Sequence, residues 1–135
     1  FDYEPGIDLP KIMIDSEAVS EAIVNLLDNA VKYSTETKFI KMIIGSENNF
    51  VFIEVQDKGI GISDEDQKKV FDKFYRVSSG LVHTTKGTGL GLSLVKQIMD
   101  AHKGTIELKS KVGEGSSFKL LFPKKSQLNN GETNA

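Results

Sequence analysis

Apolar residues between Ser16 and Tyr33 recur every three or four positions, which is the spacing of one face of an α-helix. Asp15 or Ser16 can cap the N-terminus of this helix, and Glu17 adds negative charge to its first turn. The pattern predicts a helix that packs on a core through one side and ends near Tyr33. The residues expected on the buried side are Val19, Ala22, Ile23, Leu26, Leu27 and Ala30.

A second helix with the same spacing is expected over about residues 90–102, where Lys103 and Gly104 stop it. A shorter helix is expected over residues 64–71, because Ser63 can cap its N-terminus. The inward positions of the longer helix are expected to be Leu94, Val95, Ile98 and Ala101.

Short runs rich in β-branched and aromatic residues predict about five strands. They cover residues 11–14, 39–45, 50–55, 105–110 and 117–122. Polar residues 46–49 separate the second run from the third, so these two should form an antiparallel hairpin. Helices stand between hairpins rather than after every strand. The pattern therefore favours a two-layer α/β sandwich, with a mixed sheet packed against three helices, over a doubly wound sheet.

A chain of 135 residues suits a single domain with its own core. We expect residues 11–123 to form it, with an extended lead-in at 1–10 and a polar tail at 124–135. The absence of cysteine excludes disulfides and thiolate chemistry, and a net charge of −2 gives no general attraction to nucleic acid. No apolar run approaches the roughly twenty residues that span a bilayer. Because the chain begins at Phe1 rather than at a methionine, we expect a fragment of a longer protein.

Three glycines at alternate positions, Gly87, Gly89 and Gly91, lead directly into the second long helix. A loop without side chains at a helix N-terminus exposes main-chain N–H groups at the positive end of the helix dipole, which suits a phosphate. Glycine also makes plain turns, so this cluster gains weight only from polar groups elsewhere in the chain.

The first predicted helix carries a polar flank formed by Glu21, Asn25, Asn29 and Lys32. Carboxamide and carboxylate oxygens one turn apart can hold a hard cation such as Mg²⁺, and Lys32 can reach a phosphate from the same edge. The alternative is an ordinary solvated helix face. Asparagine within a helix is mildly unfavourable by propensity, which argues for a functional reason.

Asp57 ends a predicted strand, and Gly59 and Gly61 follow it. A carboxylate at the rim of a sheet can accept a hydrogen bond from an exocyclic amine such as adenine N6, while glycines allow a sharp turn and the approach of a planar base. The alternative is a plain Asp-Lys-Gly turn. Ser117, at the start of the last predicted strand, could join the same base-binding end.

Residues 77–86 have few apolar anchors and could form either a mobile lid over a ligand or an ordinary loop. Arg76, just before them, could face phosphate oxygens or lie exposed at a helix end. Neither His83 nor His102 has a general-base partner nearby in the sequence or the spacing of a metal ligand. We expect both histidines to be structural or incidental rather than catalytic.

Taken in order, these segments resemble the catalytic ATP-binding domain of two-component sensor histidine kinases, within the superfamily that includes gyrase, Hsp90 and MutL ATPases. The resemblance covers roughly residues 10–123. Four ordered motifs carry more weight than any one of them alone. Residues 21–33 resemble the N box, 57–62 and 87–92 the two glycine boxes, 71–76 the F box, and 113–118 the closing strand motif.

The resemblance implies a fold of the Bergerat type that binds ATP and Mg²⁺. It implies that Asn25 and Asn29 ligate the magnesium ion, that Asp57 reads adenine N6, and that Glu21, Asn25 and Arg76 are catalytic. The other nucleotide contacts that it implies are Lys32, Tyr33, Gly59, Gly61, Ile62, Tyr75, Lys86, Gly87, Thr88, Gly89, Leu90, Gly91, Leu92 and Ser117.

Members of that family phosphorylate a histidine on a separate helical dimerisation domain, and neither histidine here has the matching neighbours. The resemblance therefore implies a kinase domain without its phosphoacceptor, with residues 1–10 as the remaining connection. The expected partners are that domain of the parent chain and a response-regulator receiver domain, but no nucleic acid. The isolated domain should be a monomer, cytoplasmic within a membrane-bound bacterial sensor. The alternatives are an ATP-binding regulatory module and an ATP hydrolase in which Glu21 activates water.

Overall fold

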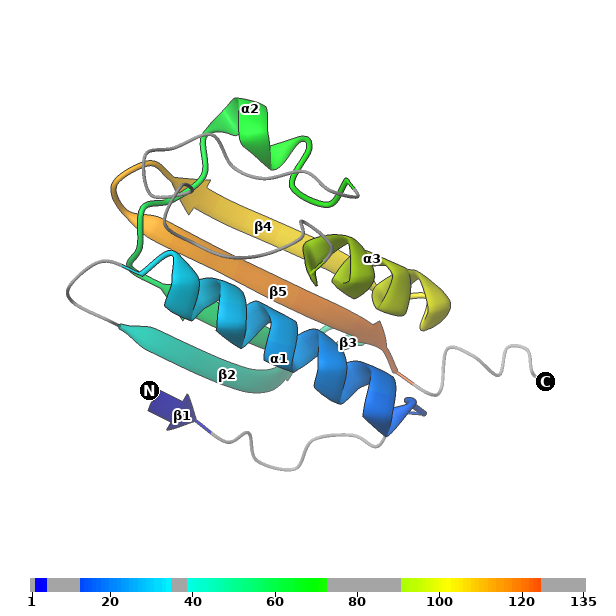
Figure 1. Ribbon diagram of the computed structural model, residues 1–135. Helices are drawn as coiled ribbons and strands as arrows, with labels where there is room; N and C mark the ends of the chain where they lie inside the picture. Colours follow the sequence, from blue (N-terminus) through cyan, green and yellow to red (C-terminus); the bar gives the residue numbers. More distant parts are fainter. Residues whose placement is uncertain (1, 5–12, 35–38, 73–90, 125–135) are drawn as a thin grey trace.

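The computed structural model describes residues 2–4, 13–34, 39–72 and 91–124. Its helices are α1 (Ser16–Lys32), α2 (Asp64–Gln67) and α3 (Gly91–Ala101). Its strands are β1 (Asp2–Glu4), β2 (Ile40–Glu47), β3 (Phe50–Asp57), β4 (Thr105–Lys111) and β5 (Gly115–Pro123). The strands form one sheet in the order β1-β2-β3-β5-β4, and α1 and α3 cover one of its faces (Figure 1). Only β1 and β2 are parallel neighbours, so the sheet is mixed and the predicted two-layer α/β sandwich is confirmed.

Helix α1 is capped at its N-terminus by Asp15, whose carboxylate accepts the main-chain N–H groups of Glu17 and Ala18 at 3.1 and 3.2 Å. A cap of this kind contributes about 1 kcal/mol, because it satisfies N–H groups that have no partner within the helix. The apolar face predicted from the sequence is the buried one. Val19, Ala22, Leu26 and Ala30 are buried, and Ile23 and Leu27 pack against the same core.

The central strands β3 and β5 direct alternate side chains to opposite faces of the sheet. Val55, Phe118 and Leu120 are buried under the helices, whereas Glu54 and Lys119, which pair across the two strands, point to the other face. No helix of the described part of the chain covers that second face (Figure 1). A strand residue must therefore lie on the first face to take part in a site formed with α1 or α3.

The N-terminal edge of the sheet differs from the prediction. Met13 and Ile14 lie in no strand and are exposed, while Lys11 and Ile12 are outside the described residues. The edge strand is instead β1, within the segment expected to be a lead-in, and it pairs with β2. Three residues give no periodicity, so only the pairing with β2 defines this strand.

The β2–β3 connection is a tighter turn than expected. Glu47 pairs with Phe50, which leaves Asn48 and Asn49 as the whole turn rather than residues 46–49. Asn48 has a φ of +48°, in the left-handed region that asparagine tolerates better than most residues.

Helix α3 buries Val95, Ile98 and Met99, whereas Ala101, expected inward, is exposed. After the end of the helix, Lys103 adopts a left-handed conformation with a φ of +56°. The N–H of Gly104 then donates to the carbonyl of Met99 at 2.8 Å. Gly104 is required by space, since a Cβ there would lie 2.5 Å from the carbonyl oxygen of Leu121. The predicted stop is thus confirmed, but the left-handed residue is the lysine and not the glycine.

The short helix α2 ends four residues before the predicted Phe71. Its expected N-cap is confirmed, because the Ser63 hydroxyl accepts the N–H of Asp66 at 3.2 Å.

Candidate nucleotide-binding site

Helices α1 and α3 meet where Asn25 faces Gly91. The Asn25 side-chain amide donates to the carbonyl of Glu21 at 2.9 Å, and this bond fixes the orientation of the carboxamide. Its oxygen then lies towards α3, where a Cβ on Gly91 would sit only 3.2 Å from it. One residue of the asparagine flank, Asn25, therefore lies beside the last glycine of the glycine-rich segment.

The polar flank of α1 is only partly directed towards this junction. Asn29 lies one turn beyond Asn25, and both are half-buried, whereas Glu21 is exposed. The Lys32 ammonium forms an ion pair with Asp28 at 3.1 Å on the same helix. Because this ion pair is exposed to solvent, it contributes at most about 1 kcal/mol to the stability of the fold. An anionic ligand can therefore compete with Asp28 for the lysine.

Carboxamide oxygens are the magnesium ligands that this site can offer. Among the described residues no group of three or more His, Cys, Asp or Glu side chains could hold a metal ion. Mg²⁺ prefers oxygen ligands and keeps several waters, so one or two protein oxygens suffice beside a phosphate. The Asn25 amide nitrogen donates to the carbonyl of Glu21, so the amide oxygen faces Gly91 on α3. The residues present therefore fit the ion.

Asp57 lies at the end of β3, at the rim of the sheet. One carboxylate oxygen accepts the N–H of Gly59 at 2.8 Å. Burial raises the pKa of the Asp57 carboxyl above its ordinary value, and hydrogen bonds from the main chain of Gly59 and Ser116 oppose that rise. A cavity of about 330 Å³ opens beside Asp57 and is otherwise lined by residues 109–111 and 114–117 of the β4–β5 hairpin.

The glycines after Asp57 serve main-chain packing. A Cβ on Gly59 would lie 2.1 Å from the carbonyl oxygen of Tyr33, which accepts the N–H of Ile60 at 3.1 Å. A Cβ on Gly61 would lie 2.1 Å from the carbonyl oxygen of Lys111, and its φ of +76° also favours glycine. The sequence suggested that these glycines make room for a base. The structure shows that protein backbone occupies the position that a Cβ would take at both glycines.

Three more of the expected nucleotide contacts, Tyr33, Ile62 and Leu92, take part in the packing of the fold. Tyr33 caps α1 and holds the turn after Asp57 through its carbonyl. The Ile62 side chain is buried in the core, and Leu92 is half-buried and packs against the same core.

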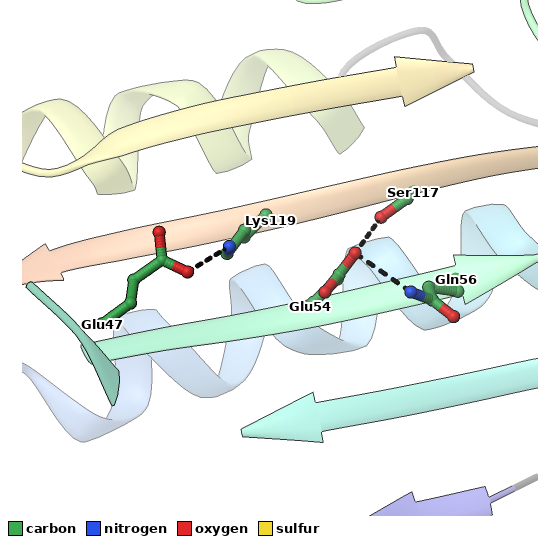
Figure 2. Close-up of polar contacts among 5 residues, drawn as sticks. All are labelled: Glu47, Glu54, Gln56, Ser117 and Lys119. Atoms are coloured by element: carbon green, nitrogen blue, oxygen red, sulfur yellow. Dashed lines mark hydrogen bonds and ion pairs between the residues drawn. The ribbon is translucent and has the colours of Figure 1, made fainter. Parts of the chain in front are cut away.

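The Ser117 side chain points away from α1 and α3, although the residue lines the cavity beside Asp57. Its hydroxyl donates to the Glu54 carboxylate on the face of the sheet opposite α1 and α3, as Figure 2 shows. The neighbouring Ser116 is buried, pairs with Asp57 across the strands and lies on the helix side. Sequence reasoning missed Ser116, although strand alternation counted from the buried Phe118 would have identified it.

Seven expected site residues lie outside the described part of the chain, and so does His83. They are Tyr75, Arg76, Lys86, Gly87, Thr88, Gly89 and Leu90. His102 is described, and both of its ring nitrogens bond to the main chain, as expected of a structural histidine.

The Asn25 carboxamide faces the first residue of α3 on the covered side of the sheet, and the Asp57 carboxylate lies at the rim of the same sheet. This arrangement is typical of a nucleotide-binding class of α/β sandwich. Residues 14–126 match the family described as histidine kinase-, DNA gyrase B- and HSP90-like ATPase. The chain belongs to this family.

Curated relatives include a sensor protein and a signal transduction histidine-protein kinase. The chain is 45% identical to sensor protein RprX of Bacteroides fragilis over 116 residues, covering 84% of this chain and 22% of the relative. It is 36% identical to the signal transduction histidine-protein kinase ArlS of Staphylococcus aureus over 125 residues, covering 90% and 28%. The chain thus spans about a quarter of the length of these relatives.

Solved structures agree with the fold. The catalytic domain of histidine kinase ThkA superposes with a TM-score of 0.74 at 27% identity, covering 91% of this chain and 77% of that one. Full-length ShkA in complex with AMPPNP superposes with a TM-score of 0.66 at 25% identity, covering 85% and 23%.

Proposed function

We propose that this chain is the ATP-binding catalytic domain of a sensor histidine kinase. It would transfer the γ-phosphoryl group of ATP to a histidine on another domain, from which the group passes to a response-regulator aspartate. The observation that carries the proposal is the approach of the Asn25 carboxamide oxygen to Gly91. It joins the expected cation ligands to the helix whose N-terminus is expected to face the phosphates.

Four of the expected site residues that the structure describes have a role in this proposal. Asn25 and Asn29 would hold Mg²⁺, which when bound neutralises charge on the ATP phosphates. Asp57 would accept a hydrogen bond from adenine N6, since its carboxylate is fixed by the N–H of Gly59. Lys32 would leave Asp28 for a phosphate oxygen. Because phosphoryl transfer depends mainly on positioning and charge stabilisation, binding residues account for much of the catalysis.

The partners follow from the same proposal. The acceptor histidine would belong to a dimerisation domain of the parent chain, and a receiver domain would accept the phosphoryl group from it. Residues 11–123 would be the catalytic domain, with 1–10 leading from the acceptor domain and 124–135 a tail. No helix in the described ranges is long and apolar enough to cross a membrane. We place this domain on the cytoplasmic side of a membrane-bound sensor, as a monomer when isolated.

Two measurements test the proposal. Isothermal titration with AMPPNP should show binding that weakens when Mg²⁺ is replaced by a chelator. Mixing the domain with an acceptor domain and ATP labelled at the γ-phosphate should give an acid-labile phosphohistidine. Binding without transfer to any acceptor domain would instead support the regulatory module.

A hydrolase would behave differently in the same preparation. Steady release of phosphate without an acceptor, lost in Glu21→Gln, would support water activation by Glu21. The exposed position of the Glu21 side chain does not favour that reading, because a general base works best where water is restrained.

A further inference from the structure

We propose that Ser110, on β4, is a positioning residue that aims the Asp57 carboxylate at the nucleotide base. The inference rests on the proposed ATP-binding function and deepens it. Ser110 would act through two neighbours, Ser116 on β5 and Ile62 in the turn after Asp57.

The Ser110 hydroxyl lies at the centre of three short contacts. Its oxygen accepts the N–H of Ile62 at 2.7 Å, lies 2.7 Å from the Ser116 hydroxyl and lies 2.9 Å from the carbonyl oxygen of Gly115. A hydroxyl has one hydrogen and two lone pairs. All three contacts are satisfied if Ser110 donates to Gly115 and accepts from both Ile62 and Ser116. The hydroxyl hydrogen of Ser116 is then directed at Ser110.

The Asp57 carboxyl is held from the same two segments. It accepts the N–H of Gly59, in the turn, at 2.8 Å, and a main-chain hydrogen bond from Ser116, in β5. Ser110 binds the turn through Ile62 and binds β5 through Ser116. One hydroxyl therefore fixes the relative position of both N–H donors that orient the carboxylate.

Gln67, at the end of α2, reinforces the tie between the turn and β4. Its side-chain amide donates to the carbonyl of Ile62 at 2.8 Å and to the carbonyl of Ser110 at 3.0 Å, which uses both of its hydrogens. Ser110 thus joins the turn to β4 in two ways. Its carbonyl accepts from Gln67, and its hydroxyl accepts from the N–H of Ile62.

Burial makes the hydroxyl hard to replace. Ser116 is 9% exposed and Ile62 is 6% exposed, so water has little access to the groups that Ser110 satisfies. Ser110→Ala would leave the Ile62 N–H and the Ser116 hydroxyl without this partner, and such groups are costly when buried. The turn and β5 would then be held less tightly relative to each other, although the Gln67 contacts remain, and the carboxylate would be less precisely directed. A misplacement of this kind weakens a directional hydrogen bond more than it weakens phosphate binding.

The test compares two nucleotides in four proteins. Dissociation constants for Mg·ATP and for purine riboside triphosphate, which lacks the exocyclic amine, are measured by titration calorimetry. Ser110→Ala should lose about fivefold to tenfold in affinity for ATP, as expected for one hydrogen bond. Its affinity for the analogue should be unchanged. Ser110→Thr, which keeps the hydroxyl, should restore the preference for ATP. The matched control is Ser46→Ala, an exposed serine at the end of β2 remote from Asp57, and it should behave as wild type.

A second readout needs no nucleotide. The main-chain hydrogen bonds of Gly59 and Ser116 lower the pKa of Asp57, so weakening them in Ser110→Ala should raise the titration midpoint of the Asp57 carboxyl carbon in NMR spectra. Ser46→Ala should leave the midpoint in place.

The outcomes separate the two proposals. Equal losses for both nucleotides with an unmoved Asp57 midpoint would mean a merely structural role and overturn the inference, as would no loss for either. If wild type binds neither nucleotide, the proposed function fails. The Asp57 midpoint then decides alone whether Ser110 positions the carboxylate.

Discussion

The main-chain N–H of Asp15 donates to Nε2 of His102 at 3.0 Å, across 87 residues of sequence. The other ring nitrogen, Nδ1, lies 2.8 Å from the carbonyl oxygen of Ile98. Because Nε2 accepts, the neutral ring must carry its hydrogen on Nδ1 and donate it to Ile98. The histidine thus joins the N-cap of α1 to the C-terminal turn of α3, and it fastens the two helices that form the candidate site.

We predict that His102→Ala lowers the free energy of unfolding by about 2 kcal/mol, since it removes two hydrogen bonds and an edge-on contact with Phe122. Urea denaturation measures the loss, and Lys103→Ala, at an exposed neighbour, is the control. Nitrogen NMR should find the hydrogen on Nδ1. A hydrogen on Nε2 would contradict the assigned bonding.

The raised pKa of Asp57 predicts how stability depends on pH. A buried carboxyl with a raised pKa favours the folded state when protonated, and this contribution is lost as the pH rises through the folded-state pKa. The stability of wild type relative to Asp57→Asn should therefore be greatest below the ordinary value of 3.8 and decline above it. Urea denaturation of both proteins across this range measures the difference. A difference that grows with rising pH would show that the hydrogen bonds outweigh burial.

The same substitution should weaken ATP binding by about tenfold or more, because hydrogen bonds to charged groups are the stronger ones. Titration calorimetry at neutral pH measures the affinity. Asp57→Asn would then bind ATP less well although its folded state no longer buries a charge. Unchanged affinity would remove Asp57 from the proposed contact with the base.

Two glycines of one hairpin should respond differently to alanine. A Cβ on Gly115 would lie 2.1 Å from the carbonyl oxygen of Asp57, whereas a Cβ on Gly113 meets nothing within 4 Å, and both residues have positive φ. Gly113→Ala should cost about 1 kcal/mol from its backbone conformation alone. Gly115→Ala should cost at least about 3 kcal/mol, since main chain must move. Similar losses in denaturation experiments would mean that the hairpin yields easily.

Asn29→Asp should impair binding of Mg·ATP by about tenfold or more, the scale seen for altered metal sites. An added negative charge beside the expected triphosphate repels it and changes the hydrogen bonding of the helix flank. Titrations at several magnesium concentrations measure the effect, with Asn49→Asp in the exposed β2–β3 turn as the control. Unaltered magnesium dependence would exclude Asn29 as a ligand.

Periodicity predicted the elements whose residues face one core. The buried face of α1 and the β2–β3 hairpin could be read from the sequence because each element is long enough to show its period. Strand β1 could not be read, since three residues show no period and only its partner β2 defines it. Met13 and Ile14 are apolar enough to suggest a strand, yet nothing in the sequence shows that they lie exposed.

The candidate site was predictable in its residues more than in its geometry. The sequence indicated Asn25, Asp57 and the glycines, but it could not show that the space beside Gly59 is filled by the carbonyl of Tyr33. Such a contact joins residues distant in the sequence and has no local pattern. The choice of Ser117 over Ser116 has a simpler cause, because the strand begins two residues earlier than expected.

Strand β1 also has a bearing on how the domain should be produced. It covers the hydrogen-bonding edge of β2 over Lys41, Met42 and Ile43. A version shortened to start near Met13 would leave those main-chain groups bare, and a bare edge of this sort recruits a strand from a second molecule. Truncated preparations should therefore self-associate as concentration increases, while preparations that keep Asp2–Glu4 should not.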